Sequence, residues 1–232
     1  MKCLAIIPAY NEGKSISDVI KKINKMAKFD VLVVNDGSID DTSSKAREAG
    51  ADFVVDSINN LGIGGAVQTG YKFAYYNNYD YAVQIDGDGQ HDPSYLTDML
   101  NLVMNENIDI LIGSRFIAKT KYKQTFFRKI GGKFISLVIK IMSKKKIYDP
   151  LSGFRLVNRK VIEEFAKNYP TDYPEAETNL KMLLQKCKIE EYSMEMKKRE
   201  SGHSFVTPFT AIWYMIKVSI ALIIVRVRGG NN

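Results

Sequence analysis

The chain has 232 residues, of which 45% are hydrophobic and 25% are charged, and its formal net charge is +7. This length suits one domain, with or without a short appendage, and the composition excludes an intrinsically disordered chain. The positive charge is concentrated in residues 115–146, which hold 11 Lys and Arg residues and no acidic residue. Such a window indicates an anionic partner, either nucleic acid, anionic lipid or phosphate. No recognised nucleic-acid motif accompanies it, so we expect no nucleic-acid partner.

The cysteines and the N-terminus suggest a reducing compartment. Cys3 and Cys187 both lie in apolar segments, which predicts two buried free thiols and no disulfide. The apolar run at residues 1–7 is too short for the hydrophobic region of a signal peptide, and Pro8 ends it. We therefore expect no secretory signal.

The first half of the chain alternates strand-like and helix-like segments. Short apolar runs predict strands at 4–7, 31–34, 53–55, 81–85 and 108–112. Apolar residues at helical spacing, capping residues and Pro93 predict helices at 16–26, 41–48, 64–76 and from 93 onward. This alternation favours an α/β fold with a mostly parallel sheet covered by helices. Because ligands bind beyond the carboxyl ends of such strands, Asp36, Asp86 and Arg115 should meet in one cleft.

The second half is less regular and contains a basic amphipathic helix at 128–146. Its expected apolar face is Ile130, Phe134, Leu137, Val138, Ile141 and Met142. Its expected polar face is Lys129, Lys133, Ser136, Lys140 and Lys144. Helices near 159–166 and 176–186 and a strand-like stretch at 189–196 follow.

The last apolar stretch, residues 209–225, spans 17 residues and contains Lys217. Trp213 and Tyr214 near one end, and arginines 226 and 228 at the other, suit a membrane interface. We favour an interfacial or partner-packed helix. A buried helix of the fold and a true membrane span, for which this length is minimal, remain open.

The segment Asp86-Gly87-Asp88-Gly89-Gln90-His91-Asp92-Pro93 carries the strongest chemical signal. Two carboxylates one residue apart, directly after a strand, suit a hard cation such as Mg²⁺ or Mn²⁺, which also binds phosphates. Gly87 would let the backbone approach a ligand, and either Gln90 or His91 could add a further metal ligand. The alternative is an acidic turn that caps a helix.

Other candidates are less specific. Asp36 either accepts hydrogen bonds from a base or ribose or forms an Asx turn. The Gly-rich helix start at 60–65 could attract phosphate through its free N–H groups. Arg115, Arg155 and Arg199 lie at loop-like positions and either hold phosphates or are solvated surface residues.

Together these segments resemble inverting family-2 glycosyltransferases of the GT-A fold. Within that family the chain is most similar to polyprenyl-phosphate sugar transferases, the group of dolichol-phosphate mannose synthase. The carrying motifs are Ile7–Glu12, Val34–Ser38, Asn60–Gly62, Asp86–Gln90, Gly113–Phe116, Asp149, Ser152–Arg155, Arg199 and Ser201–Gly202. Residues 62–70 and 168–178 look similar to small bacterial enzymes that load GlcNAc onto undecaprenyl phosphate for cell-wall polysaccharide decoration.

The resemblance implies a role for each matching position. The nucleotide sugar, with a UDP-sugar favoured, would be bound by Pro8, Tyr10, Glu12, Asp36, Asn60, Gly62, Asp86, Gly87, Asp88 and Arg199. Asp86, Asp88 and Gln90 would hold Mg²⁺ or Mn²⁺. Arg115, Arg128, Lys133 and Arg155 would contact the acceptor phosphate, and Asp149, Asp88 and Arg115 would be catalytic.

The implied organisation is a GT-A domain at 1–205, including the helix 128–146, followed by a membrane-associated helix at 206–232. The enzyme would work at the cytosolic face of the cell membrane, where a small membrane protein is a candidate partner. A lipid phosphate acceptor has a second pKa near 6 and needs no strong general base. A saccharide hydroxyl acceptor would need one, for which Asp149, Glu175 and Glu177 are candidates. Transfer from GDP-mannose and a non-catalytic nucleotide-binding module are further alternatives.

Overall fold

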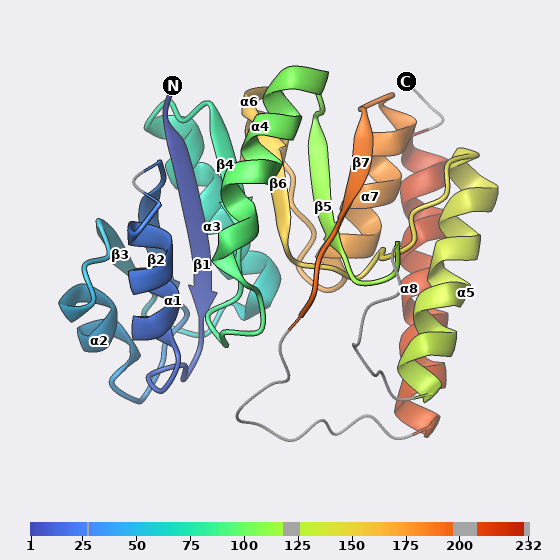
Figure 1. The fold of residues 1–232 in the computed structure, drawn as a ribbon. Coiled ribbons are helices and arrows are strands. Elements are labelled where there is room, and N and C mark those ends of the chain that lie inside the picture. The colour runs from blue at the N-terminus through green and yellow to red at the C-terminus, as the bar shows by residue number, and fades with distance from the viewer. Residues whose placement is uncertain (27, 118–125, 197–207, 230–232) are drawn as a thin grey trace.

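One sheet organises the molecule. The computed structural model describes the chain except residues 27, 118–125, 197–207 and 230–232, and of 126–128, 208–212 and 229 it describes the backbone alone. The strands lie in the order β3-β2-β1-β4-β6-β5-β7 (Figure 1). Their bounds are β1 Cys3–Ala9, β2 Asp30–Asn35, β3 Phe53–Asp56, β4 Tyr81–Gln84, β5 Ile110–Ser114, β6 Arg155–Asn158 and β7 Ile189–Ser193.

The helices follow the expected sequence with small shifts in their ends. They are α1 Ile16–Asn24, α2 Thr42–Glu48, α3 Gly62–Tyr76, α4 Leu96–Glu106, α5 Phe126–Ser143, α6 Arg159–Lys167, α7 Pro174–Leu184 and α8 Pro208–Gly229. A short 3₁₀ turn, η1 Pro93–Tyr95, precedes α4, and Asp92 caps it by accepting a hydrogen bond from the backbone N–H of Ser94. The α/β fold predicted from the alternation is confirmed.

Strand β6 was not expected. It pairs antiparallel with both β4 and β5, whereas the other pairings in the sheet are parallel. The sheet is therefore mostly parallel, as predicted, with one reversed strand, β6, between β4 and β5. Because β6 runs backwards, its first residue, Arg155, pairs with Gln84 near the carboxyl end of β4.

The core consists of two clusters, one on each face of the sheet. Alternate residues of a strand point to opposite faces. Leu4 and Ile6 accordingly join the cluster formed with α3, α5, α6, α7 and α8, and Ala5 and Ile7 join the cluster formed with α1, α2 and α4. Gly70 of α3 lies against Ile6, where a side chain would collide with the strand. Cys3 and Cys187 are buried free thiols, as expected.

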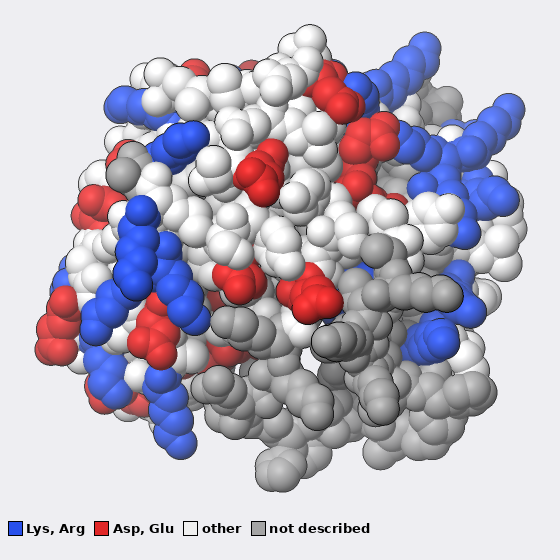
Figure 2. All heavy atoms as spheres, in the orientation of Figure 1, with Lys and Arg blue, Asp and Glu red and all other residues white. Residues whose placement is uncertain are grey.

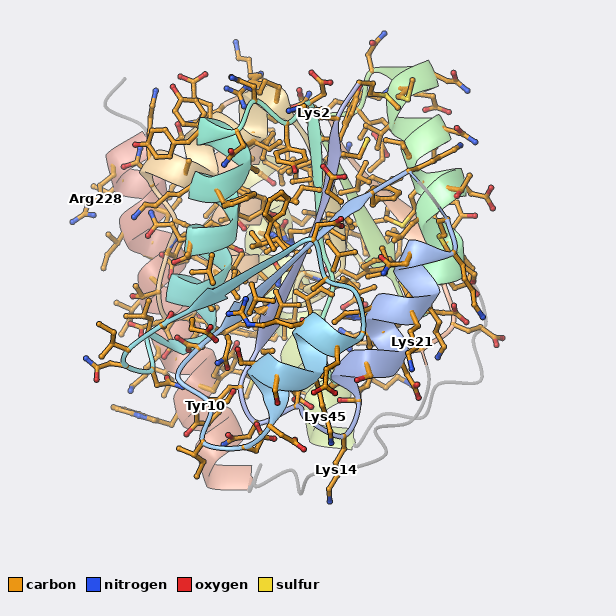
Figure 3. All side chains as sticks on the ribbon, turned by 90° about the vertical axis from the view of Figure 1, so that its left-hand side faces the viewer. Lys2, Tyr10, Lys14, Lys21, Lys45 and Arg228 are labelled. Atoms are coloured by element: carbon orange, nitrogen blue, oxygen red, sulfur yellow. The ribbon has the colours of Figure 1, made fainter. Side chains whose placement is uncertain are left out.

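The carboxyl ends of β1, β2, β4 and β5 meet at one edge of the sheet. Figure 3 shows this polarity on β1, since Tyr10, which follows the strand, lies at the opposite end of the molecule from Lys2, which precedes it. Tyr10 shares its end with Lys14 and Lys45. The loops that leave these strands, and the loop that enters β6, therefore surround one region.

Helices α5 and α8 lie side by side at one flank of the sheet, and α8 also packs on α7 (Figure 1). Val218 and Leu222 of α8 are buried in the same cluster as Ile135 and Ile139 of α5. Part of the apolar stretch 209–225 thus belongs to the core, while the division at residue 205 stays a prediction. Among the described residues, no helix combines the length and apolarity needed to cross a membrane.

Candidate active site

Three hydrogen bonds hold the loop after β4 in place at the carboxyl edge of the sheet. The backbone N–H of Asp86 donates to Nδ1 of His91 at 3.3 Å, and the carbonyl of Gly87 accepts from Oγ of Ser15 at 2.7 Å. The carboxylate of Asp88 accepts from the backbone N–H of Gln90 at 3.0 Å. The backbone is thus fixed on both sides while the side chain of Asp86 stays 38% exposed.

This loop fits a hard divalent cation that is shared with a ligand. Asp86 and Asp88 offer carboxylate oxygens, and both residues are partly exposed. Among the described residues, no group of three or more His, Cys, Asp or Glu side chains could enclose a metal ion. Mg²⁺ and Mn²⁺ suit such a pair, because they keep waters and bind substrate phosphates through one or two protein carboxylates. The assignment of the metal to Asp86, Asp88 and Gln90 stays a prediction.

His91 lies inside the fold and not at its surface. Its side chain is buried, and its ring stacks on Phe154 with 5.0 Å between centroids and 16° between planes. Burial lowers the pKa of His91 to about 4, so the ring is neutral at pH 7. Apart from its place in the motif, nothing in the sequence distinguishes this position.

The loops on the β1–β3 side are linked around Asp36. This residue is 4% exposed, and its carboxylate accepts a hydrogen bond from the backbone N–H of Leu61 at 2.7 Å. The side chain of Asn60 donates to the carbonyl of Asp36 and accepts from the N–H of Gly62. The carboxylate of Asp36 thus bonds across to the loop before α3, 25 residues away, and not within a local Asx turn. The nucleoside contacts expected of Asp36, Asn60 and Gly62 stay predictions.

The remaining predicted nucleotide-binding residues lie in or just after β1. Pro8 is buried within the strand, and Tyr10 is half exposed at the edge. The backbone N–H of Glu12 donates to Oγ1 of Thr42 at the start of α2. The loops after β1 and β2 are thus tied together, and Ser15, which follows the first of them, donates to the carbonyl of Gly87 in the loop that contains Asp86.

Close packing explains one of the glycines at the start of α3. A side chain at Gly64 would collide with the carbonyl oxygens of Pro170 and Thr171, which lie in the loop before α7. Gly62 adopts φ +76°, a conformation that glycine tolerates, and no neighbour crowds it. Close helix–loop packing therefore accounts for Gly64, whereas phosphate binding at this helix start stays a prediction.

Arg115 and Asp149 form an ion pair beneath the carboxyl edge. Asp149 is 1% exposed and accepts hydrogen bonds from the backbone N–H, Nε and Nη2 of Arg115 at 3.0, 2.6 and 2.6 Å. Glu191 of β7 holds the same loop by accepting from the backbone N–H groups of Tyr148 and Asp149. Asp149 is therefore placed to fix Arg115, and its bonded, buried carboxylate does not suit the base role considered from the sequence.

Arg155 requires a correction. It was expected to contact the acceptor phosphate from a loop, but it is fully buried as the first residue of β6. Its guanidinium donates to Oγ1 of Thr178 and to the carbonyl of Ser152. Because these bonds direct the side chain into the interior, Arg155 supports the junction between β6 and α7.

The other acceptor candidates lie on or beyond α5. Lys133 is exposed on this helix. Arg128 lies in its first turn, where the structure describes the backbone alone, and Arg199 falls outside the described residues. The contacts predicted for these three residues therefore stay predictions.

Glu175 and Glu177 occupy the first turn of α7. Burial raises the pKa of Glu175, against the opposing effect of nearby Arg155, and Asp86 raises it further. Burial also raises the pKa of Glu177, to which Asp172 adds. Of these two carboxyl groups, Glu175 is thus the one whose pKa the charge of Asp86 raises.

The expected membrane-facing helices carry apolar residues on two sides. The inner side of α5 includes Ile135 and Ile139, and Ser136, which was expected on the polar face, is buried and donates to the carbonyl of Ile147. The outer side is a stripe of exposed residues, Ile130, Phe134, Leu137 and Ile141. Helix α8 has a second such stripe, Ile216, Ile220, Ile223, Ile224 and Val227. In Figure 2, basic side chains gather at the upper right, over the flank where these helices end.

Comparison with known proteins decides the family. Residues 4–166, more than half of the chain, match the model for "Glycosyl transferase family 2". The chain belongs to glycosyltransferase family 2. The matched segment contains the loop with Asp86 and Asp88 as well as the Arg115–Asp149 pair, so these features lie within the part shared with the family.

Several similar relatives act on polyprenyl phosphates, as their names state. The UDP-N-acetylglucosamine–dolichyl-phosphate N-acetylglucosaminyltransferase of Methanococcus voltae is 30% identical over 188 residues, covering 72% of this chain and 75% of that protein. The dolichol-phosphate mannosyltransferase of Pyrococcus furiosus is 33% identical over 172 residues, covering 70% and 48%. The undecaprenyl-phosphate mannosyltransferase of Micrococcus luteus is 32% identical over 161 residues, covering 67% and 65%. The chain is accordingly a glycosyltransferase of the polyprenyl-phosphate sugar transferase group, as the motifs predicted.

Solved structures share the fold. Glucosyl-3-phosphoglycerate synthase from Mycobacterium tuberculosis, in complex with Mn²⁺, UDP and phosphoglyceric acid, has a TM-score of 0.68 at 19% identity, covering 97% of this chain and 78% of that one. The mannosyltransferase PcManGT from Pyrobaculum calidifontis, in complex with GDP-Man and Mn²⁺, has a TM-score of 0.61 at 15% identity, covering 98% and 73%. These similarities confirm the GT-A fold.

Proposed function

We propose that this glycosyltransferase moves GlcNAc from UDP-GlcNAc to undecaprenyl phosphate at the cytosolic face of the membrane, for the modification of a cell-surface polysaccharide. The observation that carries the proposal is the loop with Asp86 and Asp88. It lies at the carboxyl edge of a GT-A sheet and is fixed by three hydrogen bonds, one of which comes from Ser15 beyond the loop after β1.

The chemistry fits an acceptor that arrives already ionised. In an inverting transfer, an acceptor oxygen attacks the anomeric carbon opposite the departing diphosphate, and the transition state resembles an oxocarbenium ion. A divalent cation at Asp86 and Asp88 would neutralise charge on that diphosphate. A phosphate monoester is largely a dianion at pH 7, so it needs no strong base. The buried, ion-paired state of Asp149 agrees with this requirement.

The donor is proposed from similarity. The relative from Methanococcus voltae is named for UDP-N-acetylglucosamine, whereas those from Pyrococcus furiosus and Micrococcus luteus are named as mannosyltransferases. The segments 62–70 and 168–178, which pack against each other through Gly64, resemble enzymes that use UDP-GlcNAc. We therefore favour UDP-GlcNAc over GDP-mannose as the sugar donor.

Membrane association is proposed from the outer stripes of α5 and α8. Ile141 is 72% exposed although it lies on a helix whose other side is already buried in the core. Contiguous exposed apolar surface of this kind marks interaction sites. Lys133 and Lys140 on the same helix, and Lys144 directly after it, are exposed as well. Each basic residue near an anionic bilayer contributes about 1 kcal/mol. The occupant we propose is the anionic cytosolic leaflet, with a small membrane protein as a further partner.

A transfer assay tests the donor and the acceptor together. The protein is incubated with radiolabelled UDP-GlcNAc or GDP-mannose, undecaprenyl phosphate and Mn²⁺, and the label is then extracted into organic solvent. We expect lipid-extractable label from UDP-GlcNAc, and its loss in Asp88→Asn. Label from GDP-mannose alone would overturn the donor assignment, and label found solely in added saccharides would overturn the acceptor.

Vesicle flotation tests the membrane proposal separately. Wild-type protein should float with vesicles that contain anionic lipid, and a Leu137→Glu/Ile141→Glu variant should not. Tyr76→Glu on α3, where the tyrosine is 77% exposed, is a matched control that should float normally. Equal flotation of all three proteins would show that the α5 stripe does not bind the membrane.

A saccharide hydroxyl acceptor remains the second candidate, and Glu175 is the observation in its favour. A carboxylate with a raised pKa close to the metal loop has the properties of a general base. If the acceptor is a hydroxyl, Glu175→Gln should abolish transfer. If the acceptor is a lipid phosphate, the same variant should keep most of the transfer activity.

A further inference from the structure

His91 contacts both the loop that contains Asp86 and Asp88, called the metal loop below, and Phe154, which lies directly before β6. It follows Asp86 by five residues, and Nδ1 of its ring accepts the backbone N–H of Asp86 at 3.3 Å. The ring is 3% exposed, so water does not compete for this bond. The hydrogen bond therefore closes the loop on itself, with Asp86 and Asp88 on the closed segment.

The bond defines the state of the ring. A nitrogen that accepts a hydrogen bond carries no proton, so the proton of the neutral imidazole lies on Nε2. Nδ1 also lies 3.6 Å from Oδ2 of Asp86, a separation that would be an ion pair if the ring were protonated. Nδ1 thus accepts its hydrogen bond from the main chain of Asp86.

Phe154 packs against the ring of His91. The histidine ring stacks on Phe154, whose carbonyl accepts the backbone N–H of Gly113 at 2.8 Å. The ring of Phe154 also covers Gly113, where an added Cβ would lie 2.6 Å from the ring carbon Cδ1. Gly113 is followed by Ser114 and then by Arg115, which pairs with Asp149. Phe154 therefore lies between His91 and β5, the strand that ends directly before Arg115.

We propose that His91 is a positioning residue for the metal site: its Nδ1 acceptor and its stacked ring together hold the main chain of Asp86 at a fixed place relative to β5. This inference rests on the proposed metal site of Asp86 and Asp88. Groups that orient metal ligands typically change metal affinity by about 10–100-fold when they are replaced. We place His91 in this class, acting through the backbone of a ligand and not as a ligand itself.

Two substitutions separate the acceptor from the ring. His91→Phe keeps an aromatic ring against Phe154 but has no acceptor for the Asp86 N–H. His91→Asn loses the ring but places Oδ1 where Nδ1 was, so it can restore the acceptor. If His91 merely fills the core, His91→Phe should be the milder change. If it positions Asp86, His91→Asn should be the milder change for metal binding, even where its thermal stability is lower.

The readout is Mn²⁺ affinity measured by electron paramagnetic resonance titration, alongside thermal unfolding of each protein. We expect His91→Phe to weaken Mn²⁺ binding by about tenfold or more and His91→Asn by less than about threefold. Equal Mn²⁺ affinities in wild type and His91→Phe would overturn the inference. Wild-type protein that binds no Mn²⁺ would instead refute the proposed metal site, so the two failures are distinguishable.

A second measurement needs no variant. In the metal-free wild-type protein, the amide of Asp86 should exchange with solvent slowly, because its N–H is bonded to a buried acceptor. The matched reference is the amide of Gly89, which lies in the same loop. Exchange of Asp86 as fast as that of Gly89 would contradict the inference, whether or not His91→Phe folds.

Discussion

The Arg115–Asp149 pair gives a quantitative stability prediction. Asp149 is buried and accepts three hydrogen bonds from Arg115, two from the guanidinium and one from the backbone N–H. Arg115→Ala removes the two guanidinium bonds and the positive charge but keeps the backbone bond. The variant therefore leaves an ionised carboxylate inside the fold with one remaining donor from residue 115.

Breaking a buried ion pair by removing one partner costs about 3–5 kcal/mol. The side chain of Arg115 is 14% exposed and the backbone bond remains, so we expect the lower end, about 3 kcal/mol. For a domain of this size, 1 kcal/mol lowers Tm by about 2–4 °C, so the Tm of Arg115→Ala should fall by about 6–12 °C. Arg115→Ala/Asp149→Asn, which removes the stranded charge, should recover part of this loss.

Urea unfolding followed by circular dichroism measures these differences in free energy. Arg47→Ala is the matched control, because Arg47 forms a 2.6 Å ion pair with Asp56 in which both side chains are about half exposed. Such surface pairs contribute about 0–1 kcal/mol. The reasoning is refuted if Arg115→Ala costs no more than Arg47→Ala, or if the double variant is no more stable than Arg115→Ala.

Three further predictions follow from single contacts. Gly113→Ala should lower the free energy of unfolding by about 1–3 kcal/mol, because the new methyl group meets the ring of Phe154; unchanged urea midpoints would contradict it. Glu175→Gln should be more stable than wild type at pH 8 and should lose this advantage as the pH falls toward 4.5. The reason is that the buried carboxyl group of Glu175 has a raised pKa, so it stabilises the wild-type fold below its unfolded pKa and loses that contribution as it ionises. Parallel pH profiles of Tm for the two proteins would rule this out. Lys133→Ala should raise the KM for undecaprenyl phosphate severalfold and leave the KM for the nucleotide sugar unchanged, and equal effects on both would argue against an acceptor contact.

The sequence predicted the features that are local in the chain. The parallel strands and their connecting helices were evident because each has its own apolar period. The position of Asp86 and Asp88 at the carboxyl edge followed from their place directly after β4. The cap formed by Asp92 was equally local, since a capping residue and the helix start that it serves are adjacent.

The features that were missed depend on partners far away in the chain. Strand β6 has four residues and begins with an arginine, so its strand conformation comes from pairing with β4 and β5 and not from its own pattern. The burial of Arg155 depends on Thr178, which lies 23 positions away. The burial of His91 could not be predicted because its stacking partner, Phe154, lies directly before that unexpected strand.

Helix α5 illustrates a partial success. Its existence was predicted, but its inward side includes Ile135 and Ile139, and four of the six residues of the expected apolar face are exposed. Periodicity shows that a helix has apolar residues, yet it does not show which side meets the core when two sides are apolar. The end at Ser143 is marked by Lys144, which adopts φ +64° and stops the helix before residue 146.

The central claim is that Asp86 and Asp88 hold the cation through which the diphosphate is bound. Calorimetric titration of UDP into the protein, with Mn²⁺ or with a chelator, measures this directly, and Asp88→Asn is the isosteric control. We expect UDP to bind the wild-type protein in Mn²⁺ at least about tenfold more tightly than it binds with the chelator, and at least about tenfold more tightly than it binds Asp88→Asn in Mn²⁺. Equal UDP affinity with and without Mn²⁺, or an unchanged affinity in Asp88→Asn, would contradict it.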